Sequence, residues 1–280
     1  MALKLTKNGQ PVIPTRISHY TNLTGLMGMV ESGQMWASNV SFLNDRRELQ
    51  HGLEASLEAI RSFTKTPNHK SWHDALKHAA QSLGEGLVPN TYAVCFCSSA
   101  DVLSQWRGYG GREQGVSLTF DRKALSALMT KSKASLYPVI YGNISTATKM
   151  SEALKAELEA LVAFEGLVGL SKAEKDTAAY KAICLLLPQF KHYGFHDERE
   201  LRYVLQHETV RDDVCFRAAG NVLVPYLKLV PGGATKLPIL SVTIGPGRDQ
   251  ELTQRSLRMY LDKKGYADTD VKLSDVPFRS

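Results

Sequence analysis

Two glutamates lie two residues apart in the segment HDERELRYVL, a spacing that places them together if the segment is a strand. Alternate side chains of a strand point to the same face, so Glu198, Glu200 and Arg202 would form one row. Arg199 and Leu201 would point the other way. Carboxylates this close raise each other's pKa unless a cation offsets their charge, and a raised pKa suits a group that moves protons. The pair predicts a catalytic site, and the alternative is a solvated edge strand with mixed charge.

A second polar group lies near the start of the chain, in the segment RISHYTN. If this segment is a strand, Ile17, His19 and Thr21 share one face, and Ser18 and Tyr20 share the other. A histidine on a strand is often a hydrogen-bonded structural residue. That interpretation of His19 stands beside a role in ligand binding.

Two further clusters could supply metal ligands. They combine acidic residues and histidines in NDRRELQH and HYGFHDE, namely Asp45, Glu48 and His51, and His192, His196 and Glu198. Gly194 interrupts any regular helical spacing in the second cluster, and the chain has no HExxH motif. GYGGREQG matches neither GxGxxG nor a phosphate-binding P-loop. We therefore expect no metal, and we interpret Asp45 and Glu48 as caps of a helix.

Composition and charge restrict the class of protein. Hydrophobic residues at 43% and charged residues at 22% are ordinary for a globular protein, and 280 residues fit one domain, with or without a helical insertion. The net charge of +6 favours an anionic partner, with nucleic acid first, but it does not locate a binding face.

Cysteine usage and the apolar segments indicate the compartment. Cys95, Cys97, Cys184 and Cys215 are scattered, and CFC is too tight for a CxxC pair, so we expect buried free thiols in a reducing cytosol. The first residues have no apolar core of signal-peptide length, and the run AICLLLP is too short to span a bilayer. The prediction is a cytoplasmic protein without a membrane partner.

The elements that would hold the polar groups follow from periodicity and from turn residues. We expect a strand at 16–21, a helix that Asn22 or Thr24 caps and Gly33 ends, and a strand at 34–38. A helix opened by Asn44 or Asp45 and another within 69–87 follow. Further strands are expected in TYAVCFCSS, GVSLTFD, LYPVIYG, ELRYVLQ, VLVPYLKL and LSVTIGPG, and a helix near the end.

Residues 146–188 are rich in Ala, Leu, Glu and Lys and predict two helices that insert into or cap the fold. Strands in several groups, with helices between them and few βαβ repeats, favour an α+β fold with a mixed or antiparallel sheet and flanking helices. We expect residues 1–280 to form a single domain that contains this insertion.

The two polar segments resemble parts of a known superfamily. HYTNLTGLMGMVESGQMWAS is similar to the opening of ADP-ribosyltransferase folds, in particular the DNA-modifying (DarT-like) toxin transferases, in which a strand with His-x-Thr leads into an Asn-Leu helix. DERELR is similar to the Glu-x-Glu element of those enzymes. Across nearly the whole chain, SHYTNL, VSFLNDRRE, VCFCSSADVLSQWRGYG, QGVSLTF, ERELRYV and TIGPG resemble, in order, the bacterial family of unknown function DUF2971, often found among phage-defence genes. This chain departs from that family at Arg46, where a proline commonly follows the Asn-Asp pair.

The resemblance implies an ADP-ribosyltransferase-like split sheet that binds NAD. His19 would hydrogen-bond the adenosine ribose, with Thr21 beside it. Glu200 would hold the 2′-hydroxyl of the nicotinamide ribose and stabilise the positive charge that develops there as the glycosidic bond breaks. Glu198 would align or deprotonate the attacking group.

An aromatic surface under the nicotinamide ring would come from Tyr20, Trp106 or Tyr109, and the alternative is that these are core aromatics. Ser98, at the end of its strand, would support the catalytic glutamate, as a polar residue does in some transferases.

The acceptor would be held by polar and basic residues. We assign Asn44, Asp45, Arg46 and Arg107 to substrate binding, because basic side chains suit phosphates, although the same charges also serve solubility. The predicted function is an NAD-dependent ADP-ribosyltransferase that modifies RNA or DNA in preference to protein. It would act as a toxin in phage defence or in a toxin-antitoxin pair, with an antitoxin or chaperone as a further partner. The alternative is a non-catalytic module on the same fold that binds a nucleotide or nucleic acid.

Overall fold

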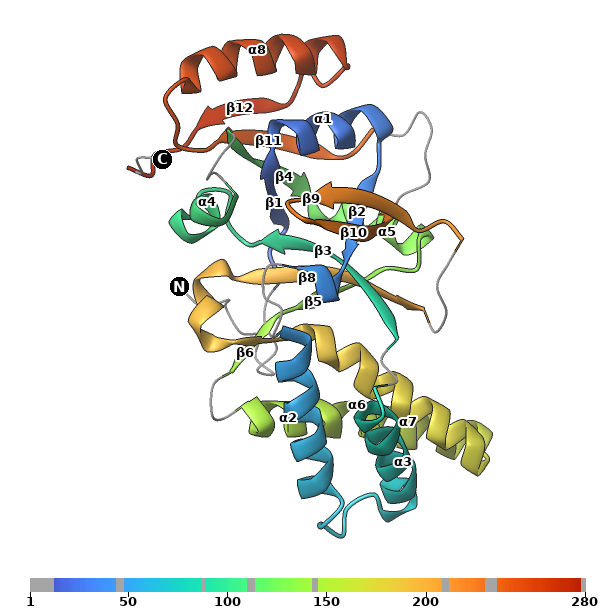
Figure 1. The fold of residues 1–280 in the computed structure, drawn as a ribbon. Helices are drawn as coiled ribbons and strands as arrows, with labels where there is room; N and C mark the ends of the chain where they lie inside the picture. Colours follow the sequence, from blue (N-terminus) through green and yellow to red (C-terminus); the bar gives the residue numbers. More distant parts are fainter. Residues whose placement is uncertain are drawn as a thin grey trace.

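A computed structural model describes residues 13–43, 48–86, 89–109, 114–142, 146–207, 212–229 and 236–277. A large sheet with helices α1, α5 and α8 occupies the upper part of Figure 1, and helices α2, α3, α6 and α7 lie together below it. The helices are α1 (Leu23–Ser32), α2 (Glu48–Phe63), α3 (His73–Gly84), α4 (Leu103–Tyr109), α5 (Arg122–Lys131), α6 (Thr146–Val168), α7 (Lys172–Leu186) and α8 (Gln250–Lys263). Short 3-10 helices are η1 (Val40–Phe42), η2 (Lys70–Trp72), η3 (Leu187–Gln189) and η4 (Tyr193–Glu198).

The described strands form one large sheet and one small pair. The large sheet contains β1 (Arg16–Asn22), β2 (Met35–Asn39), β3 (Asn90–Cys97), β4 (Gly115–Asp121), β5 (Ser135–Pro138), β8 (Glu200–His207), β9 (Cys215–Ala219), β10 (Val222–Leu229), β11 (Ile239–Ile244) and β12 (Asp270–Leu273). β6 (Ile140–Gly142) and β7 (Phe190–His192) form a separate parallel pair. In the large sheet β11 and β12 are parallel and the other pairs are antiparallel, so the predicted α+β class with a mainly antiparallel sheet and flanking helices is confirmed.

The sheet branches at β3. One edge of β3 pairs along its whole length with β8, which in turn pairs with β5. The other edge pairs with β1 at Cys97 and with β2 at Ala93 and Tyr92. From there β1 continues to β4, β11 and β12, whereas β2 continues to β10 and β9. Two branches therefore share a single edge of β3.

Local signals explain the first unit of the fold. The Asn22 side chain accepts a hydrogen bond of 2.8 Å from Gly25 N at the start of α1, and Gly33 ends the helix with a φ of 64°. A left-handed residue is least costly when it is glycine. The strand, helix and strand expected for residues 16–38 are confirmed.

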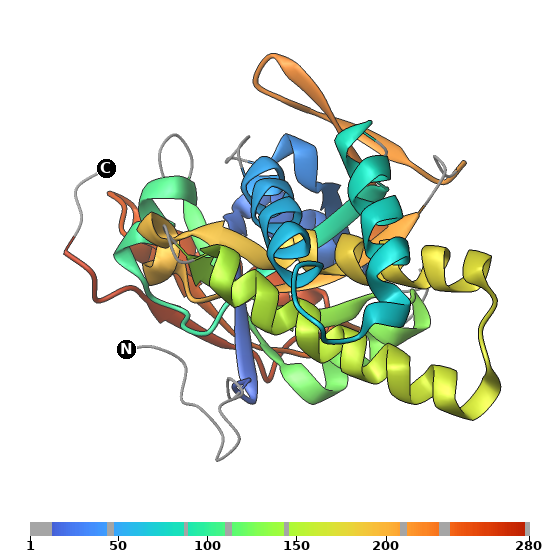
Figure 2. The same ribbon diagram turned by 90° about the horizontal axis from the view of Figure 1, so that it is seen from below.

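Two hydrophobic cores support the two parts of Figure 1. The first lies between the sheet and helices α1, α5 and α8 and contains Ile17, Phe96, Leu118 and Leu201. The second lies among α2, α3, α6 and α7, which we call the helical lobe, and contains Trp72 and Leu187. Figure 2 shows these four helices from below. The two helices predicted within residues 146–188 are α6 and α7.

Several boundaries differ from expectation. The segment LYPVIYG forms two strands, β5 and β6, because each pairs with a different partner. β8 begins at Glu200 rather than near Glu198, which lies in η4. Arg199, between them, has a φ of 45° and breaks the extended chain. Periodicity did not predict the short strands β7, β9 and β12.

None of the described helices is long and apolar enough to cross a membrane.

Candidate functional site

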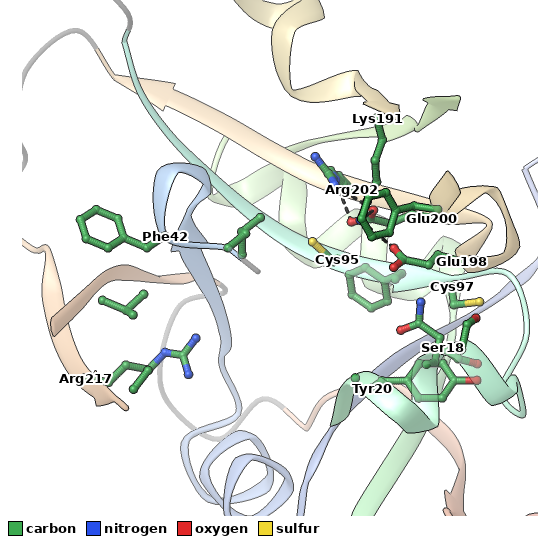
Figure 3. Close-up of a pocket in the computed structure, with 18 residues that line it drawn as sticks. Ser18, Tyr20, Phe42, Cys95, Cys97, Lys191, Glu198, Glu200, Arg202 and Arg217 are labelled. Atoms are coloured by element: carbon green, nitrogen blue, oxygen red, sulfur yellow. Dashed lines mark hydrogen bonds and ion pairs between the residues drawn. The ribbon is translucent and has the colours of Figure 1, made fainter. Parts of the chain in front are cut away.

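A cavity of about 430 Å³ lies where β1, β2 and β8 meet β3 in the branched sheet (Figure 3). Paired strands bring side chains together there: Ser18 is opposite Cys97, which is opposite Glu200, and Cys95 is opposite Arg202. Helix α4, η1, η4 and the β9–β10 hairpin supply the walls. The lining residues are Ser18, Tyr20, Phe42, Leu43, Cys95, Phe96, Cys97, Ser104, Gln105, Gly108, Lys191, Phe195, Glu198, Glu200, Arg202, Arg217, Ala219 and Val224.

A buried ion pair forms one end of the cavity. Arg202 Nε lies 2.7 Å from Glu200 Oε1, and Arg202 Nη2 lies 2.8 Å from Glu200 Oε2. Both side chains are buried, and Arg202 Nη1 also donates to the carbonyl of Pro188 at 2.9 Å. Alternation along β8 places Glu200 and Arg202 on one face, as the sequence predicts.

Lys191 joins the two glutamates. Its Nζ lies 2.7 Å from Glu198 Oε2 and 3.1 Å from Glu200 Oε2. Glu198 therefore meets Glu200 through a shared cation and from a 3-10 helix, not from a neighbouring position on the strand. Its side chain is 24% exposed, against 6% for Glu200, so it is the more accessible carboxylate.

The electrostatic state of Glu200 differs from the expected one. Burial raises the pKa of its carboxyl, but the charges of Arg202 and Lys191, with hydrogen bonds from Arg202 and from the Cys95 thiol, outweigh burial and hold the pKa well below its usual range. The expected mutual raising of pKa does not govern Glu200, because two cations offset its charge. Glu200 is thus a fixed anion rather than a proton carrier.

The opposite end of the cavity is basic. Arg217, from the hairpin β9–β10, points toward the centre in Figure 3, and its Nη2 donates to Ser38 Oγ at 2.9 Å. The charged lining residues are three cations, Lys191, Arg202 and Arg217, and two anions, Glu198 and Glu200. The described lining therefore carries a net charge of +1, with its acidic groups at one end and Arg217 at the other.

Tyr20 is the predicted aromatic residue that lines the cavity. Its hydroxyl donates to the carbonyl of Ser99 at 3.0 Å, and burial raises its pKa. Trp106 packs edge-on behind it with ring centroids 4.7 Å apart, is 1% exposed, and donates from Nε1 to Asp101. Trp106 therefore supports Tyr20 from the core and does not present a stacking surface, which corrects the prediction for it. Phe42 and Phe195 line the cavity instead.

His19 does not itself line the cavity, but it contacts two residues that do, Cys95 and Phe96. It pairs with Leu118, its ring lies 5.6 Å from that of Phe96, and its Nδ1 lies 2.8 Å from the carbonyl oxygen of Cys95. Burial lowers the pKa of His19, the charge of Arg217 lowers it further, and the Cys95 hydrogen bond opposes them. The neutral ring then donates from Nδ1.

Thr21 shares the face of His19, and neither lines the described cavity. Alternation along β1 turns Ser18 and Tyr20 toward the cavity, and the contact of His19 and Thr21 with the same ligand as Glu200 stays a prediction.

The remaining predicted residues are placed as follows. Ser98 follows β3, and its backbone N–H donates to the carbonyl of Arg199 beside Glu200. Arg107 is exposed on α4 and does not line the cavity, whereas its neighbours Ser104, Gln105 and Gly108 do. Asn44, Asp45 and Arg46, and the side chain of Tyr109, lie outside the described residues.

His192 and His196, two of the candidate metal ligands, stabilise η4 instead. His192 Nδ1 accepts from Gly194 N at 3.1 Å, and His196 Nδ1 lies 3.0 Å from the carbonyl of Tyr193. Within the described ranges no group of three or more His, Cys, Asp or Glu side chains could hold a metal ion. None of the four cysteines forms a disulfide; Cys97 and Cys184 are buried as predicted, whereas Cys95 and Cys215 are partly exposed.

The match to a protein family covers part of this site. Residues 105–203 match the model of a family described as protein of unknown function, DUF2971. The DUF2971 match runs from α4 into β8 and so contains Lys191, Glu198, Glu200 and Arg202. No curated protein and no solved structure matches the chain.

Lys191 and Arg217 are the main residues that the sequence did not indicate. Lys191 lies in KHYGFHDERE, seven residues before Glu198, and is brought to it by a short strand and a 3-10 helix that the sequence did not predict. Arg217 lies in a strand of five residues that, among the described strands, pairs with β10 alone. A search for basic residues near acidic pairs in the sequence would have found Lys191. The position of Arg217 in the cavity follows only from the pairing of the strands in the sheet.

Proposed function

We propose that this protein binds NAD⁺ in the cavity of Figure 3 and transfers ADP-ribose to a macromolecule, with nucleic acid favoured over protein. The observation that carries the proposal is one cavity with two carboxylates at one end, paired with Lys191 and Arg202, and the cation Arg217 at the other. NAD⁺ combines a diphosphate with a cationic nicotinamide riboside, so its two halves suit the two ends.

In this arrangement the side chains of the chain have distinct tasks. Arg217 binds the diphosphate, and Tyr20, Phe42 and Phe195 offer apolar and aromatic surface to the rings. When bound, NAD⁺ supplies a glycosidic bond whose cleavage develops positive charge on the ribose and releases nicotinamide. Glu200, held ionised by Arg202 and Lys191, provides a fixed negative charge near that ribose.

Glu198 is the carboxylate we assign to the acceptor. Because it is more exposed than Glu200 and contacts the same Lys191, it can accept a proton from an attacking hydroxyl or amine as the new bond to ADP-ribose forms. The acceptor thereby loses one proton to Glu198, and nicotinamide leaves with the electron pair of the broken bond.

The proposal is tested by nicotinamide release and by the fate of the label when the protein is mixed with NAD⁺ labelled in its adenine and with cellular RNA, DNA and protein. We expect label on nucleic acid, and a loss of about 100-fold or more in release for Glu198→Gln and Glu200→Gln. Glu159→Gln, on the exposed face of α6, is the matched control and is expected to match the parent. Wild-type activity in both site variants would contradict the roles assigned.

A second candidate is a non-catalytic module that binds a nucleotide or nucleic acid. The non-catalytic module is favoured because Lys191 and Arg202 neutralise the negative charge of Glu200, so this carboxylate stabilises a positive charge on a ligand less strongly. This module would be stabilised by NAD⁺ in a thermal melt without releasing nicotinamide. The transferase predicts release in the same sample.

The place of the protein in phage defence or in a toxin-antitoxin pair belongs to the same proposal. Expression should then arrest growth, and Glu198→Gln should relieve the arrest. Growth arrest that persists in a folded Glu198→Gln variant would separate toxicity from transfer.

A further inference from the structure

A second cavity, of about 520 Å³, lies where helix α7 meets the outer strands β8 and β5. It is separate from the cavity of Figure 3, since the two share no lining residue. The lining residues come from α7, from the end of β8, from β5 with the turn that precedes it, and from the residue before β3: Pro89, Lys133, Ser135, Tyr137, Tyr180, Lys181, Cys184, Leu185, Val204, Leu205, Gln206 and His207.

The charge of this second cavity has one sign. Lys133 and Lys181 are exposed cations, and His207 is a further basic residue of the lining. The described lining contains no aspartate or glutamate. A cavity of this composition selects an anionic ligand.

The backbone holds Lys133 in a costly conformation. It follows the end of α5 with a φ of 59°, and its N–H donates to the carbonyl of Thr130 at 2.9 Å. A glycine or asparagine would adopt this left-handed conformation at lower cost, by about 1 kcal/mol. A lysine therefore occupies this turn in spite of the conformational cost of its left-handed backbone.

The same cavity offers surface for flat rings. Tyr137 and Tyr180 line it from β5 and α7 and are both partly exposed. Gln206 donates from Nε2 to Thr91 Oγ1 at 3.0 Å and to the carbonyl of Cys184 at 2.6 Å, so both of its N–H groups are occupied within the protein. The two lysines and two tyrosines of the lining match the phosphates and base faces of a nucleic-acid strand.

Strand β8 joins the two cavities. Glu200 and Arg202 line the first, and Val204 and Gln206, on the same face of the strand, line the second. Arg202 is opposite Tyr137 in the pairing of β8 with β5. From Glu200 to Gln206 the strand runs about 20 Å, and between the two cavities its face contacts Cys184 of α7 and Pro188 of η3.

We propose that the second cavity binds a single-stranded segment of nucleic acid, with phosphates on Lys133 and Lys181 and a base against Tyr137 or Tyr180, and so holds the acceptor for the first cavity. The role as acceptor site rests on the proposed transferase function. Binding of the strand does not depend on it.

The test measures binding of a fluorescent single-stranded oligonucleotide of about a dozen nucleotides to the full chain over a range of salt concentrations. Lys133→Gln/Lys181→Gln is expected to weaken binding about tenfold and to lower the slope of log affinity against log salt by about 1.4, since two phosphate contacts are lost. Lys77→Gln/Lys155→Gln removes the same charge from exposed sites of the helical lobe and should bind as the parent does. Lys133→Arg/Lys181→Arg keeps the charge and should retain affinity.

Three outcomes would overturn the proposal: no binding by the parent, equal binding by the parent and Lys133→Gln/Lys181→Gln, or equal losses in that variant and the Lys77/Lys155 control. An acidic peptide that binds in place of the oligonucleotide, with the same dependence on both lysines, would also overturn it. Nicotinamide release from NAD⁺ alone should be unchanged in Lys133→Gln/Lys181→Gln. If no variant releases nicotinamide while the selective loss of oligonucleotide binding remains, the cavity is a nucleic-acid site and the transferase proposal fails.

Discussion

Glu200 and Arg202 form a two-point ion pair inside the protein, with nitrogen-oxygen distances of 2.7 and 2.8 Å, and project from the same face of β8. Because the pair is buried, each charge depends on the other for its stability in the interior. Lys191 adds a second cation to the same carboxylate.

Removal of the arginine should therefore destabilise the fold strongly. We expect Arg202→Met to lower the free energy of unfolding by about 3 to 5 kcal/mol, since it leaves Glu200 with Lys191 as its remaining cation. Combining it with Glu200→Gln should restore part of the loss. Urea denaturation measures both. Lys264→Met, which breaks a partly exposed ion pair with Glu31, should lower the free energy of unfolding by less than about 1 kcal/mol. An equal loss in Lys264→Met and Arg202→Met would show that burial of the ion pair does not matter.

Arg217 should act on binding more than on chemistry. We expect Arg217→Gln to raise KM for NAD⁺ about tenfold with little change in kcat, because it lies at the end of the cavity away from the glutamates. Arg217→Lys should recover part of the affinity. Steady-state nicotinamide release measures both constants, with exposed Arg255→Gln as control. A fall in kcat at constant KM would assign Arg217 to the transition state instead.

His19 should make stability depend on pH. Its pKa is lowered in the folded protein from an ordinary value of 6.5, so below that value the unfolded chain binds the proton more readily than the folded one. The stability is complete above about pH 6.5 and declines as the pH falls below it. Between about pH 7.5 and pH 5.5 the free energy of unfolding should fall less in His19→Gln than in the parent. Parallel curves would contradict a lowered pKa.

A close contact in α1 gives a double-mutant test of packing. A Cβ added to Gly25 would lie 2.2 Å from Thr21 Oγ1, so Gly25→Ala should destabilise the protein by about 1 to 3 kcal/mol despite the better helix propensity of alanine. Thr21→Ala removes that oxygen. The double variant should recover most of the loss in a thermal melt, and purely additive effects would mean that the clash is relieved elsewhere.

The sequence predicted those elements whose signals are local. Asn22 and Gly33 bracket α1, and alternating residues identify β1, β3, β4 and β8. It also placed Glu200 and Arg202 on one face, since a strand allows no other arrangement once its limits are known. These features depend on a few neighbouring residues.

The missed features depend on distant ones or on backbone conformations that composition does not reveal. Glu198 leaves the strand because Arg199 adopts a positive φ, which no rule assigns to an arginine. Arg217 reaches the cavity through the pairing of β9, β10 and β2. The sequence correctly predicted that His19 shares a face of its strand with Ile17 and Thr21. It could not predict where the cavity lies, because that depends on how β1, β2 and β8 pair with β3.

The shared edge of β3 has a consequence for biosynthesis. β1 and β2 precede β3 in the chain, whereas β8, which covers its other edge, follows only after the helices of the lobe. A chain emerging from the ribosome therefore carries β3 with one edge exposed for about a hundred residues of translation, at about 5 to 20 residues per second. An unpaired strand edge is prone to incorrect pairing. The nascent chain should therefore depend on chaperones for the several seconds before β8 has been synthesised.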